Sequence, residues 1–405
     1  MTFKLLTVTA LNFIVGLSVG FAQTPVQLTD TPATTATAPA NNQAAAKQTV
    51  QPVAQQATQE LTDKFAKIRE QFLLVGLAAV AVTPETNAPL VAVGYRTSRE
   101  QHAVSANDQW HIGSITKSMT ATLAAILVKE QKLSFDMQLQ AVWPEMPMHD
   151  SYKTVTLMEL LSHRSGLTED IAKTTNWNQR FFDKRPITAQ RSEWAQEILA
   201  TTPEHARGEY AYSNAGFVVA GALMEKVTGQ SWEALMQEKL FTPLGMTRSG
   251  FGAPSKEAPW GHQTSFFSTK PMDPNATDSI ADNPAAMGPA GTVHVSLADM
   301  AQFIRLQLGQ FPDVLTRAQL APLQQADLSK GDYHGGFVHL RRGWAKGVAL
   351  HHSGSNTFWY ATIWIAPEVG LGFFTATNSA GMLAPKALDA ATVELLNSVQ
   401  SKPAK

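Results

Sequence analysis

The sequence predicts a two-lobed α/β domain, in which an antiparallel sheet is built from both ends of the chain and a helical lobe is inserted between them. The first observation is a set of β-like runs near both ends: residues 75–82, 90–96, 348–352, 358–365 and 370–377. The second is the middle of the chain, residues 114–310, where the pattern is mostly helical and is broken by Pro and Gly. A cleft is expected where the two lobes meet.

Both ends of this domain also carry helical patterns. Near the start, apolar residues lie on one helical face at Leu61, Phe65, Ile68 and Phe72. The closing segment, 385–398, places Leu388, Ala391 and Leu395 on one face. Turns are predicted between the strands, at Pro84 and 87–89 and at 367–370. The predicted order is therefore helix-strand-strand at the start and strand-strand-strand-helix at the end.

Composition excludes several classes of protein. The chain has 405 residues, of which 44% are hydrophobic and 16% charged, and this is a globular composition. Its formal net charge of −1 argues against nucleic acid or an anionic membrane surface as the main partner. There are no cysteines, which excludes disulfides, thiolate nucleophiles and Cys-ligated zinc.

The N-terminal segment predicts export. Residues 1–22 combine an early Lys4, an apolar run and small residues before a cleavage point after Ala22, which is typical of a secretory signal peptide. An uncleaved membrane anchor is the alternative, because the apolar run is close to spanning length. Residues 23–58 consist mostly of Ala, Thr, Gln and Pro and predict a disordered linker. The folded domain is expected at 59–400, and the location in the periplasm or medium of a bacterium.

The first motif with catalytic chemistry is Ser114-Ile115-Thr116-Lys117, at the start of an apolar helical pattern. Ser114 and Lys117 are three residues apart and share one helical face. A buried Lys with a lowered pKa can remove the proton of a Ser hydroxyl and make it a nucleophile. The N-terminus of the helix also presents N–H groups to a forming oxyanion. An N-capping Ser beside a solvent-facing Lys is the alternative.

The second motif is Tyr212-Ser213-Asn214, a short polar turn before a new apolar helix. Such a turn can point Tyr212 and Asn214 into the cleft. Tyr donates and accepts protons, and Asn can orient both a Lys amine and a substrate carbonyl. A half-buried Tyr in an ordinary turn is the alternative.

The third motif is His352-Ser353-Gly354-Ser355, placed after a predicted strand that ends at His351. A Gly-containing polar segment at the end of a strand lets a substrate lie along the strand edge. The N–H of Ser355 is then a candidate second oxyanion donor. A similar His-x-Gly pattern occurs at 334–336 in a predicted Gly-rich loop, but two strong strand runs follow the 352 site directly.

The three motifs occur in the order of the penicillin-recognising serine hydrolases, which the chain resembles over roughly residues 60–400. The connecting stretches 155–167, 243–246 and 288–292 are similar as well. The resemblance is closest to the branch that holds class C β-lactamases, D-Ala-D-Ala carboxypeptidases, D-aminopeptidases and serine esterases. It implies the serine β-lactamase/DD-peptidase fold and an acyl-enzyme serine hydrolase.

One departure from the β-lactamase pattern lies in the third motif. Class C β-lactamases typically have Lys-Thr-Gly there, whereas this chain has His352-Ser353-Gly354. A His at this place resembles the carboxypeptidase and D-aminopeptidase members. Efficient β-lactam hydrolysis is therefore not expected, although acylation by a β-lactam is.

The resulting interpretation assigns a role to each motif residue. Ser114 is the nucleophile, and Lys117 is its base with help from Tyr212, which also passes a proton to the leaving group. Asn214 positions Lys117 and the substrate. His352 is expected to orient Tyr212 and to meet a substrate carboxylate. Ser353 and Gly354 bind the substrate along the strand edge, and the oxyanion hole is formed by the N–H groups of Ser114 and Ser355.

The expected substrate is a short peptide that contains a D-amino acid, as in fragments of the bacterial cell wall. A β-lactam or a carboxylic ester is the alternative within the class, and a non-catalytic penicillin- or wall-binding module is the alternative outside it. No metal or other cofactor is expected, because the eleven His residues are scattered and there is no His-Glu-x-x-His. His163, beside a Gly turn, is predicted to be structural.

Overall fold

The structure is a computed structural model that describes residues 59–84, 89–173, 177–255, 257–265, 268–276 and 279–400. These residues belong to one compact unit, Thr58–Lys405. The predicted signal peptide, 1–22, the predicted linker, 23–58, and most of the predicted turn at 85–88 lie outside the described residues. Within the described part of the chain, no helix combines the length and the apolar character that a membrane span requires.

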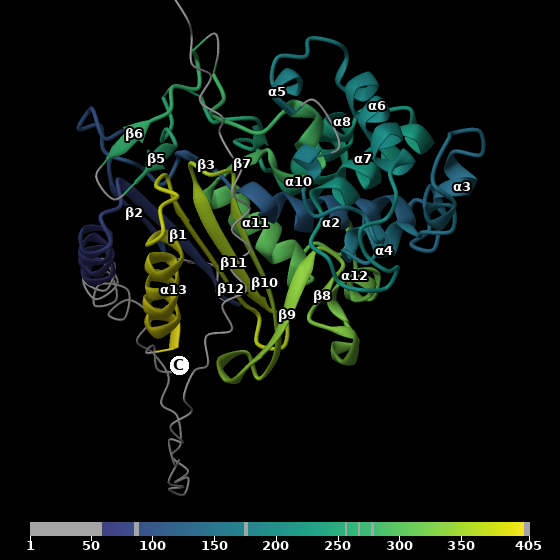
Figure 1. Cartoon of the computed structure of the whole chain (residues 1–405). Coiled ribbons are helices and arrows are strands. Elements are labelled where there is room, and N and C mark those ends of the chain that lie inside the picture. The colour runs from purple at the N-terminus through teal and green to yellow at the C-terminus, as the bar shows by residue number, and fades with distance from the viewer. Residues whose placement is uncertain are drawn as a thin grey trace, which may run out of the picture. The chain divides into compact units, whose positions relative to one another are not determined.

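A seven-stranded antiparallel sheet forms one lobe, in the order β2-β1-β12-β11-β10-β9-β8 (Figure 1). Its strands come from both ends of the chain, and the first strand pairs with the last, with Leu77 opposite Thr377. The bounds are β1 Gly76–Val82, β2 Leu90–Gly94, β8 Tyr333–His334, β9 Phe337–Arg342, β10 Gly347–Ser355, β11 Tyr360–Ala366 and β12 Leu371–Thr377. The predicted assembly of the sheet from both chain ends is confirmed.

The two faces of the sheet are covered by different helices because side chains alternate along each strand. Leu77 and Ala79 of β1 pack in one apolar cluster with Phe65, from the helix at 59–71, and with Leu388 of α13 (Ala384–Gln400). Ala78 and Val80 point the other way, into the main core, which also contains residues of α11 (Leu297–Gln307). The sheet is thus the middle layer of this lobe.

The inserted region is mostly helical, as predicted, but it also contains short strands that the sequence pattern did not indicate. Its helices are α2 Thr116–Lys129, α3 Leu139–Val142, α4 Leu157–Leu161, α5 Trp177–Arg180, α6 Ile187–Ala200, α7 Asn214–Thr228, α8 Trp232–Leu235, α9 Thr242–Leu244, α10 Gly288–Gly291 and α11, and α12 (Arg317–Gln324) follows. Its strands are β3 Gln109–His111, β4 Gly250–Phe251, β5 His262–Thr264, β6 Thr269–Pro271 and β7 Val293–Ser296. They form the small sheets β3-β7-β4 and β5-β6 beside the main sheet.

Two sequence expectations about strands near the third motif are wrong. The strand predicted to end at His351 continues to Ser355, so the motif lies inside β10 and not after it. Residues 333–342, which include the predicted Gly-rich loop, form the hairpin of β8 and β9. Both errors have one cause: Gly and Ser residues suggested a loop, whereas pairing with neighbouring strands holds these segments extended.

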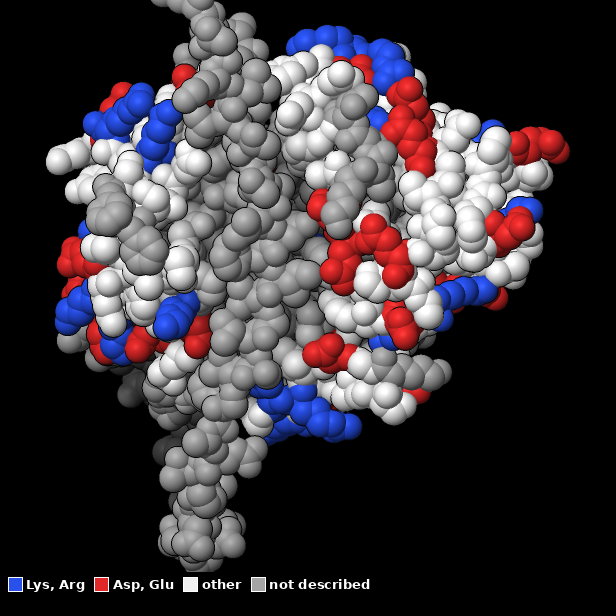
Figure 2. Space-filling view, viewed as in Figure 1, with Lys and Arg blue, Asp and Glu red and all other residues white. Residues whose placement is uncertain are grey.

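Charged side chains of both signs are distributed over the face shown in Figure 2. Lys and Arg side chains occur there as separate groups, mainly toward the edge of this view, with Asp and Glu side chains among and inside them. This agrees with the near balance of 32 basic and 33 acidic residues in the whole chain.

Candidate active site

The first motif lies where a short 3₁₀ turn, η1 (Gly113–Ile115), runs into α2. Ser114 is in the turn, and Lys117 is in the first turn of α2 with no exposed surface. The Nζ atom of Lys117 lies 2.9 Å from Ser114 Oγ, 2.7 Å from Asn214 Oδ1 and 2.7 Å from the carbonyl oxygen of Ala290. The structure therefore joins residues of the first two predicted motifs through one amine.

The hydrogen-bond partners of Lys117 determine what its amine has left to offer Ser114. The oxygens of Asn214 and Ala290 can only accept hydrogen bonds, so each takes one N–H of the amine. Burial lowers the pKa of Lys117 well below its ordinary value of 10.5. The neutral amine then has one lone pair left, and Ser114 is its remaining partner. The Ser114 hydroxyl can donate its proton to that lone pair, as a general base requires.

The second motif is positioned by the start of α7. Ser213 caps this helix by accepting from the N–H of Gly216, so Tyr212 and Asn214 flank the cap. The Tyr212 hydroxyl faces Ser114, and the Tyr212 ring centroid lies 4.9 Å from Lys117 Nζ. Burial raises the pKa of Tyr212, so Tyr212 is held as the neutral phenol. Lys117 and Tyr212 are the two candidate bases beside Ser114. Because Tyr212 keeps its own proton, the neutral amine of Lys117 is the group that can accept the proton of the Ser114 hydroxyl.

His163 is buried and structural, as predicted, and it supports Tyr212. Its Nδ1 accepts a hydrogen bond from the Ser213 N–H at 3.0 Å, and its ring centroid lies 4.3 Å from that of Tyr212. Its backbone has a positive φ of 56°, which is uncommon for a residue other than Gly. Burial, followed by repulsion from Lys117 and His352, lowers the pKa of His163 well below its ordinary value. The neutral His163 ring therefore packs against Tyr212 and limits its movement.

The third motif approaches Ser114 closely because two glycines leave room for the backbone. A Cβ atom on Gly354 would lie 2.0 Å from the carbonyl oxygen of Ile112 and 2.6 Å from the amide nitrogen of Ser114. A Cβ on Gly113, which has a φ of +50°, would lie 2.3 Å from the amide nitrogen of Ser355. The backbone segments that carry the two predicted oxyanion donors are therefore adjacent.

His352 is buried in β10 and has different neighbours from those expected. Its Nε2 lies 3.1 Å from the Tyr333 hydroxyl, and its Nδ1 lies 2.6 Å from the carbonyl oxygen of Ser353. Within the described part of the chain, His352 forms no hydrogen bond with Tyr212, the residue that it was expected to orient. Burial, with a smaller contribution from Lys117, lowers the pKa of His352 to about 3, so the ring is neutral near neutral pH. This differs from the expectation of a charged His352 that meets a substrate carboxylate.

The remaining residues of the third motif support the edge of the site. The Ser353 side chain faces Tyr360, and Ser355 Oγ donates to the carbonyl oxygen of Trp359 at 2.7 Å. The competing pattern at 334–336 makes other contacts: His334 contacts Ser162 and the carbonyl oxygen of Pro322. The choice of the 352 site over the 334 site agrees with the position of Gly354 against Ser114.

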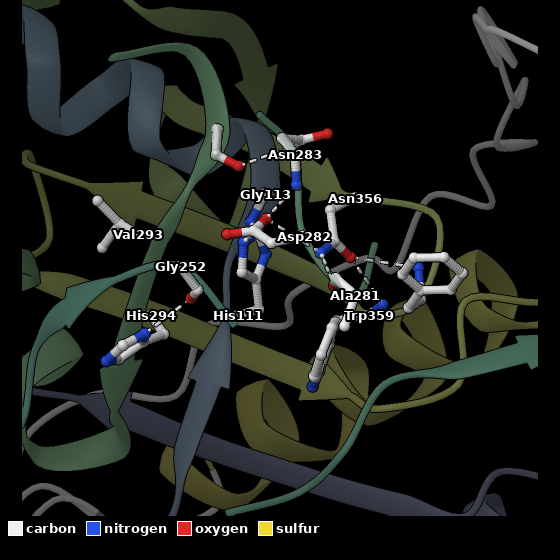
Figure 3. A network of polar contacts seen from close by, with 12 residues as sticks. His111, Gly113, Gly252, Ala281, Asp282, Asn283, Val293, His294, Asn356 and Trp359 are labelled. Carbon is white, nitrogen blue, oxygen red and sulfur yellow. Dashed lines mark hydrogen bonds and ion pairs between the residues drawn. The ribbon is translucent and has the colours of Figure 1, made fainter. Parts of the chain in front are cut away.

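A polar network behind the nucleophile turn was missed by the sequence analysis (Figure 3). His111 is fully buried, its Nδ1 accepts from the Gly113 N–H at 3.1 Å, and its Nε2 lies 2.8 Å from Asp282 Oδ1. Asn356 donates to the carbonyl oxygen of Ala281 and to Asp282. The network joins the turn before Ser114 to the segment that follows Ser355. No local signal indicates it, since Asp282 is far from both partners in sequence.

Comparison with known proteins agrees with this geometry. The sequence profile of the family described as Beta-lactamase matches residues 61–397, almost the whole described domain. The chain belongs to the Beta-lactamase family. It is 27% identical over 336 residues to "Penicillin-binding protein 4" from Amycolatopsis lactamdurans, a match that covers 78% of this chain and 84% of that protein.

Solved structures show that this member of the Beta-lactamase family has the fold inferred from the motifs. A D-amino acid amidase from Ochrobactrum anthropi SV3 superposes with a TM-score of 0.67 at 19% identity, covering 85% of this chain and all of that one. A class C β-lactamase from Rhodobacter sphaeroides gives a TM-score of 0.66 at 19% identity, covering 84% and 99%. The predicted serine β-lactamase/DD-peptidase fold and the assignment to serine hydrolases are confirmed.

Proposed function

We propose that this serine hydrolase works through an acyl-enzyme on Ser114 and acts on short peptides or amides that contain a D-amino acid. One observation carries the proposal: Lys117 Nζ lies 2.9 Å from Ser114 Oγ, and its other two partners, Asn214 and Ala290, are acceptors that leave the lone pair of the neutral amine for the Ser114 hydroxyl. A Ser beside a base with this geometry is an activated nucleophile.

Acylation follows from the contacts around Ser114. Lys117 takes the hydroxyl proton while Ser114 Oγ forms a bond to the acyl carbon, and the carbonyl oxygen becomes an oxyanion that the N–H groups of Ser114 and Ser355 stabilise. Tyr212, a neutral phenol that faces Ser114, gives its proton to the leaving nitrogen or oxygen as the acyl bond breaks. The proton on Lys117 then restores the Tyr212 hydroxyl.

Deacylation uses the same groups with water in place of Ser114. Lys117 accepts a proton from the water as its oxygen attacks the acyl carbon, Ser114 leaves with the proton of Tyr212, and the proton on Lys117 then restores the Tyr212 hydroxyl. The products are the free acid and the original Ser114 hydroxyl. Asn214 keeps the Lys117 amine in place through both steps, because its oxygen accepts one N–H at 2.7 Å.

The choice of D-amino-acid substrates is supported by the fold and by the third motif. The neighbour from Ochrobactrum anthropi is named as a D-amino acid amidase. This chain has His352 where class C β-lactamases typically have a Lys, which disfavours rapid β-lactam turnover. We expect esters and β-lactams to acylate Ser114, but we do not expect either class to be the biological substrate.

The test uses purified protein, a fluorophosphonate probe and a panel of D-amino-acid amides, D-Ala-D-Ala peptides, nitrocefin and p-nitrophenyl esters. Wild type should label at Ser114 and should turn over D-configured amides or peptides faster than their L-isomers. Ser114→Ala should lose both labelling and turnover while its circular dichroism spectrum stays native. Labelling of Ser114→Ala as strong as that of wild type would remove the nucleophile assignment.

A second candidate is a binding protein that is acylated by penicillin and turns over slowly or not at all. It is favoured by the 27% identity to a protein named "Penicillin-binding protein 4". The intact Ser114, Lys117 and Tyr212 arrangement supports turnover instead. A fluorescent penicillin distinguishes the two, because a binding protein gives one stable adduct per chain and no burst followed by steady release.

We further propose that the protein is exported to the periplasm or medium, where it associates with the cell wall, and that export removes residues 1–22. The support is the signal-like pattern that ends in small residues at Gly20 and Ala22. Intact mass of the protein from its native host should give Gln23 as the first residue. A full-length chain recovered in the membrane fraction would favour the uncleaved anchor.

A further inference from the structure

Tyr333 is a buried residue of the site that none of the three motifs contains. It lies on β8 with 2% of its surface exposed, and its hydroxyl is 3.1 Å from His352 Nε2. Its ring centroid lies 4.5 Å from that of His163 and 6.4 Å from that of Tyr212. Tyr333 thus contacts the third motif and stands beside the residues that surround Lys117.

The hydrogen-bond partners of His352 fix its protonation state. Nδ1 faces the Ser353 carbonyl oxygen at 2.6 Å, and a carbonyl can only accept, so Nδ1 carries the proton. A neutral imidazole then has a lone pair at Nε2. The Tyr333 hydroxyl, whose pKa burial raises well above 10, stays protonated and donates to that lone pair.

The titratable groups that face His352 do not favour a second proton on its ring. Lys117 approaches from α2, His163 from the segment after α4, and His351 is its neighbour on β10. Tyr333 and Tyr212 are the facing phenols, and both are held neutral by burial. Among the described residues, no carboxylate forms a hydrogen bond or ion pair with His352.

Tyr333 has little freedom to release His352. The turn between β8 and β9 consists of Gly335 and Gly336, which have φ values of 57° and 83°. The carbonyl oxygen of Gly336 accepts from Ser118 Oγ at 2.7 Å, and the N–H of Gly336 donates to the carbonyl oxygen of Leu161 at 2.9 Å. The hairpin that carries Tyr333 is therefore attached to α2, the same helix that carries Lys117.

We propose that Tyr333 is a specificity-determining residue, which holds His352 as a neutral acceptor so that the third motif presents no cation to the substrate. The inference rests on the proposed acyl-enzyme function and narrows its substrates. The site takes amides and esters with an uncharged leaving group ahead of those whose leaving group carries a carboxylate. A Lys at this position would shift that preference toward the carboxylate, because the ordinary pKa of Lys, about 10.4, lies roughly four units above that of His.

The experiment compares two substrate pairs that differ only in one carboxylate. The first pair is a D-Ala-D-Ala peptide with a free C-terminus and its C-terminal amide. The second is a phenyl ester and its m-carboxyphenyl counterpart. For wild type, kcat/KM should favour the uncharged member of each pair, and the ratio should be constant between pH 5 and 8. His352→Lys should shift the ratio about tenfold toward the carboxylate, the effect of one charged hydrogen bond.

Tyr333→Phe isolates the role of the hydroxyl. Without the donated hydrogen bond, Nε2 is free to bind a proton, so the ratio should move toward the carboxylate substrate as pH falls. The ¹³Cε1 signal of labelled His352 should titrate at higher pH than in wild type. In Tyr333→Phe combined with His352→Asn, which cannot titrate, the pH dependence should disappear. If Tyr333→Phe does not fold, the wild-type ratio of kcat/KM within each substrate pair, and its change in His352→Lys, test whether the third motif presents a cation to the substrate.

The proposal is overturned if wild type favours the carboxylate member of both pairs, or if Tyr333→Phe changes neither the ratio nor the His352 signal with pH. Failure of the proposed function has a different signature. If fluorophosphonate does not label Ser114, the acyl-enzyme itself is wrong. If Ser114 is labelled and the esters react but the D-peptides do not, only the D-amino-acid assignment fails, and the ester pair still tests Tyr333.

Discussion

The Nζ atom of Lys117 lies 2.7 Å from Oδ1 of Asn214, although 97 positions separate the two residues in sequence. The amide oxygen is a neutral acceptor, so it orients the amine without attracting a proton to it. A carboxylate in the same place would favour the charged ammonium, which cannot act as a base. This contact explains how Lys117 is both fixed in position and kept available to Ser114.

Replacement of Lys117 by Ala should lower the acylation rate by about 10²–10⁴, the range typical for loss of a general base. Lys117→Arg should recover little of it, because guanidinium stays protonated. Stopped-flow measurement of the ester burst checks both variants. Near-normal acylation by Lys117→Arg would show that another group takes the Ser114 proton.

Asn214→Asp should move the ascending limb of the pH profile of kcat/KM to higher pH. The new carboxylate raises the pKa of Lys117, by about 1–3 units for an opposite charge at this distance, and catalysis needs the deprotonated amine. Activity at pH 7 should fall accordingly. Asn214→Ala is the matched control: it removes the oxygen acceptor without adding charge, so it should not move the limb upward.

Asp282→Ala should lower kcat about tenfold or more while it changes KM less, because it acts on the oxyanion turn and not on substrate binding. His111 must keep Nδ1 unprotonated to accept from Gly113, and Asp282 fixes the proton on Nε2. Asp282→Asn retains an oxygen acceptor and should rescue most of the loss. Equal losses in both variants, or a loss confined to KM, would contradict this role.

The folded domain should lose stability steeply as pH falls below 6.5. Burial lowers the pKa of His262 and of His351 to about 4 and that of His352 to about 3. Between those values and about 6.5, the unfolded chain binds protons that the folded chain does not, so acid favours unfolding. The free energy of unfolding should be lower by roughly 3 kcal/mol or more at pH 4.5 than at pH 7.

Urea unfolding at pH 7, 6, 5 and 4.5 measures this dependence. His351→Gln removes one of the neutral rings and should flatten the curve. His102→Gln, at an exposed position, is the control and should leave the slope unchanged. A free energy of unfolding that stays constant down to pH 4.5 would show that these histidines are protonated in the folded state.

The parts of the fold and site that could be predicted are those written in local sequence. The motif at Ser114 and the polar turn at 212–214 are short patterns with direct structural meaning, and the segments at both ends of the domain carry β-like runs. The order of the motifs then placed Ser114, Lys117, Tyr212 and Asn214 in one site, where the structure joins them.

The contacts of Tyr333 and Asp282 could not be predicted in the same way. Tyr333 belongs to a two-residue strand beside two glycines, a pattern that indicates a loop, and only its pairing with β9 makes it part of the sheet. Asp282 meets His111 across 171 positions of sequence, as a consequence of tertiary packing alone. The neutral state of the His352 ring could not be predicted. Burial determines the pKa of this ring, and no local sequence pattern reports burial.

The pairing of the first strand with the last has a consequence for synthesis. Gly76 accepts a hydrogen bond from Thr377, which the ribosome adds 301 residues later. Until β12 emerges, β1 has one unpaired edge, and neither β11 nor β10 can join it in the sheet. Folding of this lobe is thus delayed to the end of translation, since long-range pairing must wait for its partner. A chain that leaves the cytoplasm as it is made would reach the secretion channel still extended, and a chain that stops before residue 371 would have an exposed β edge that favours degradation or aggregation.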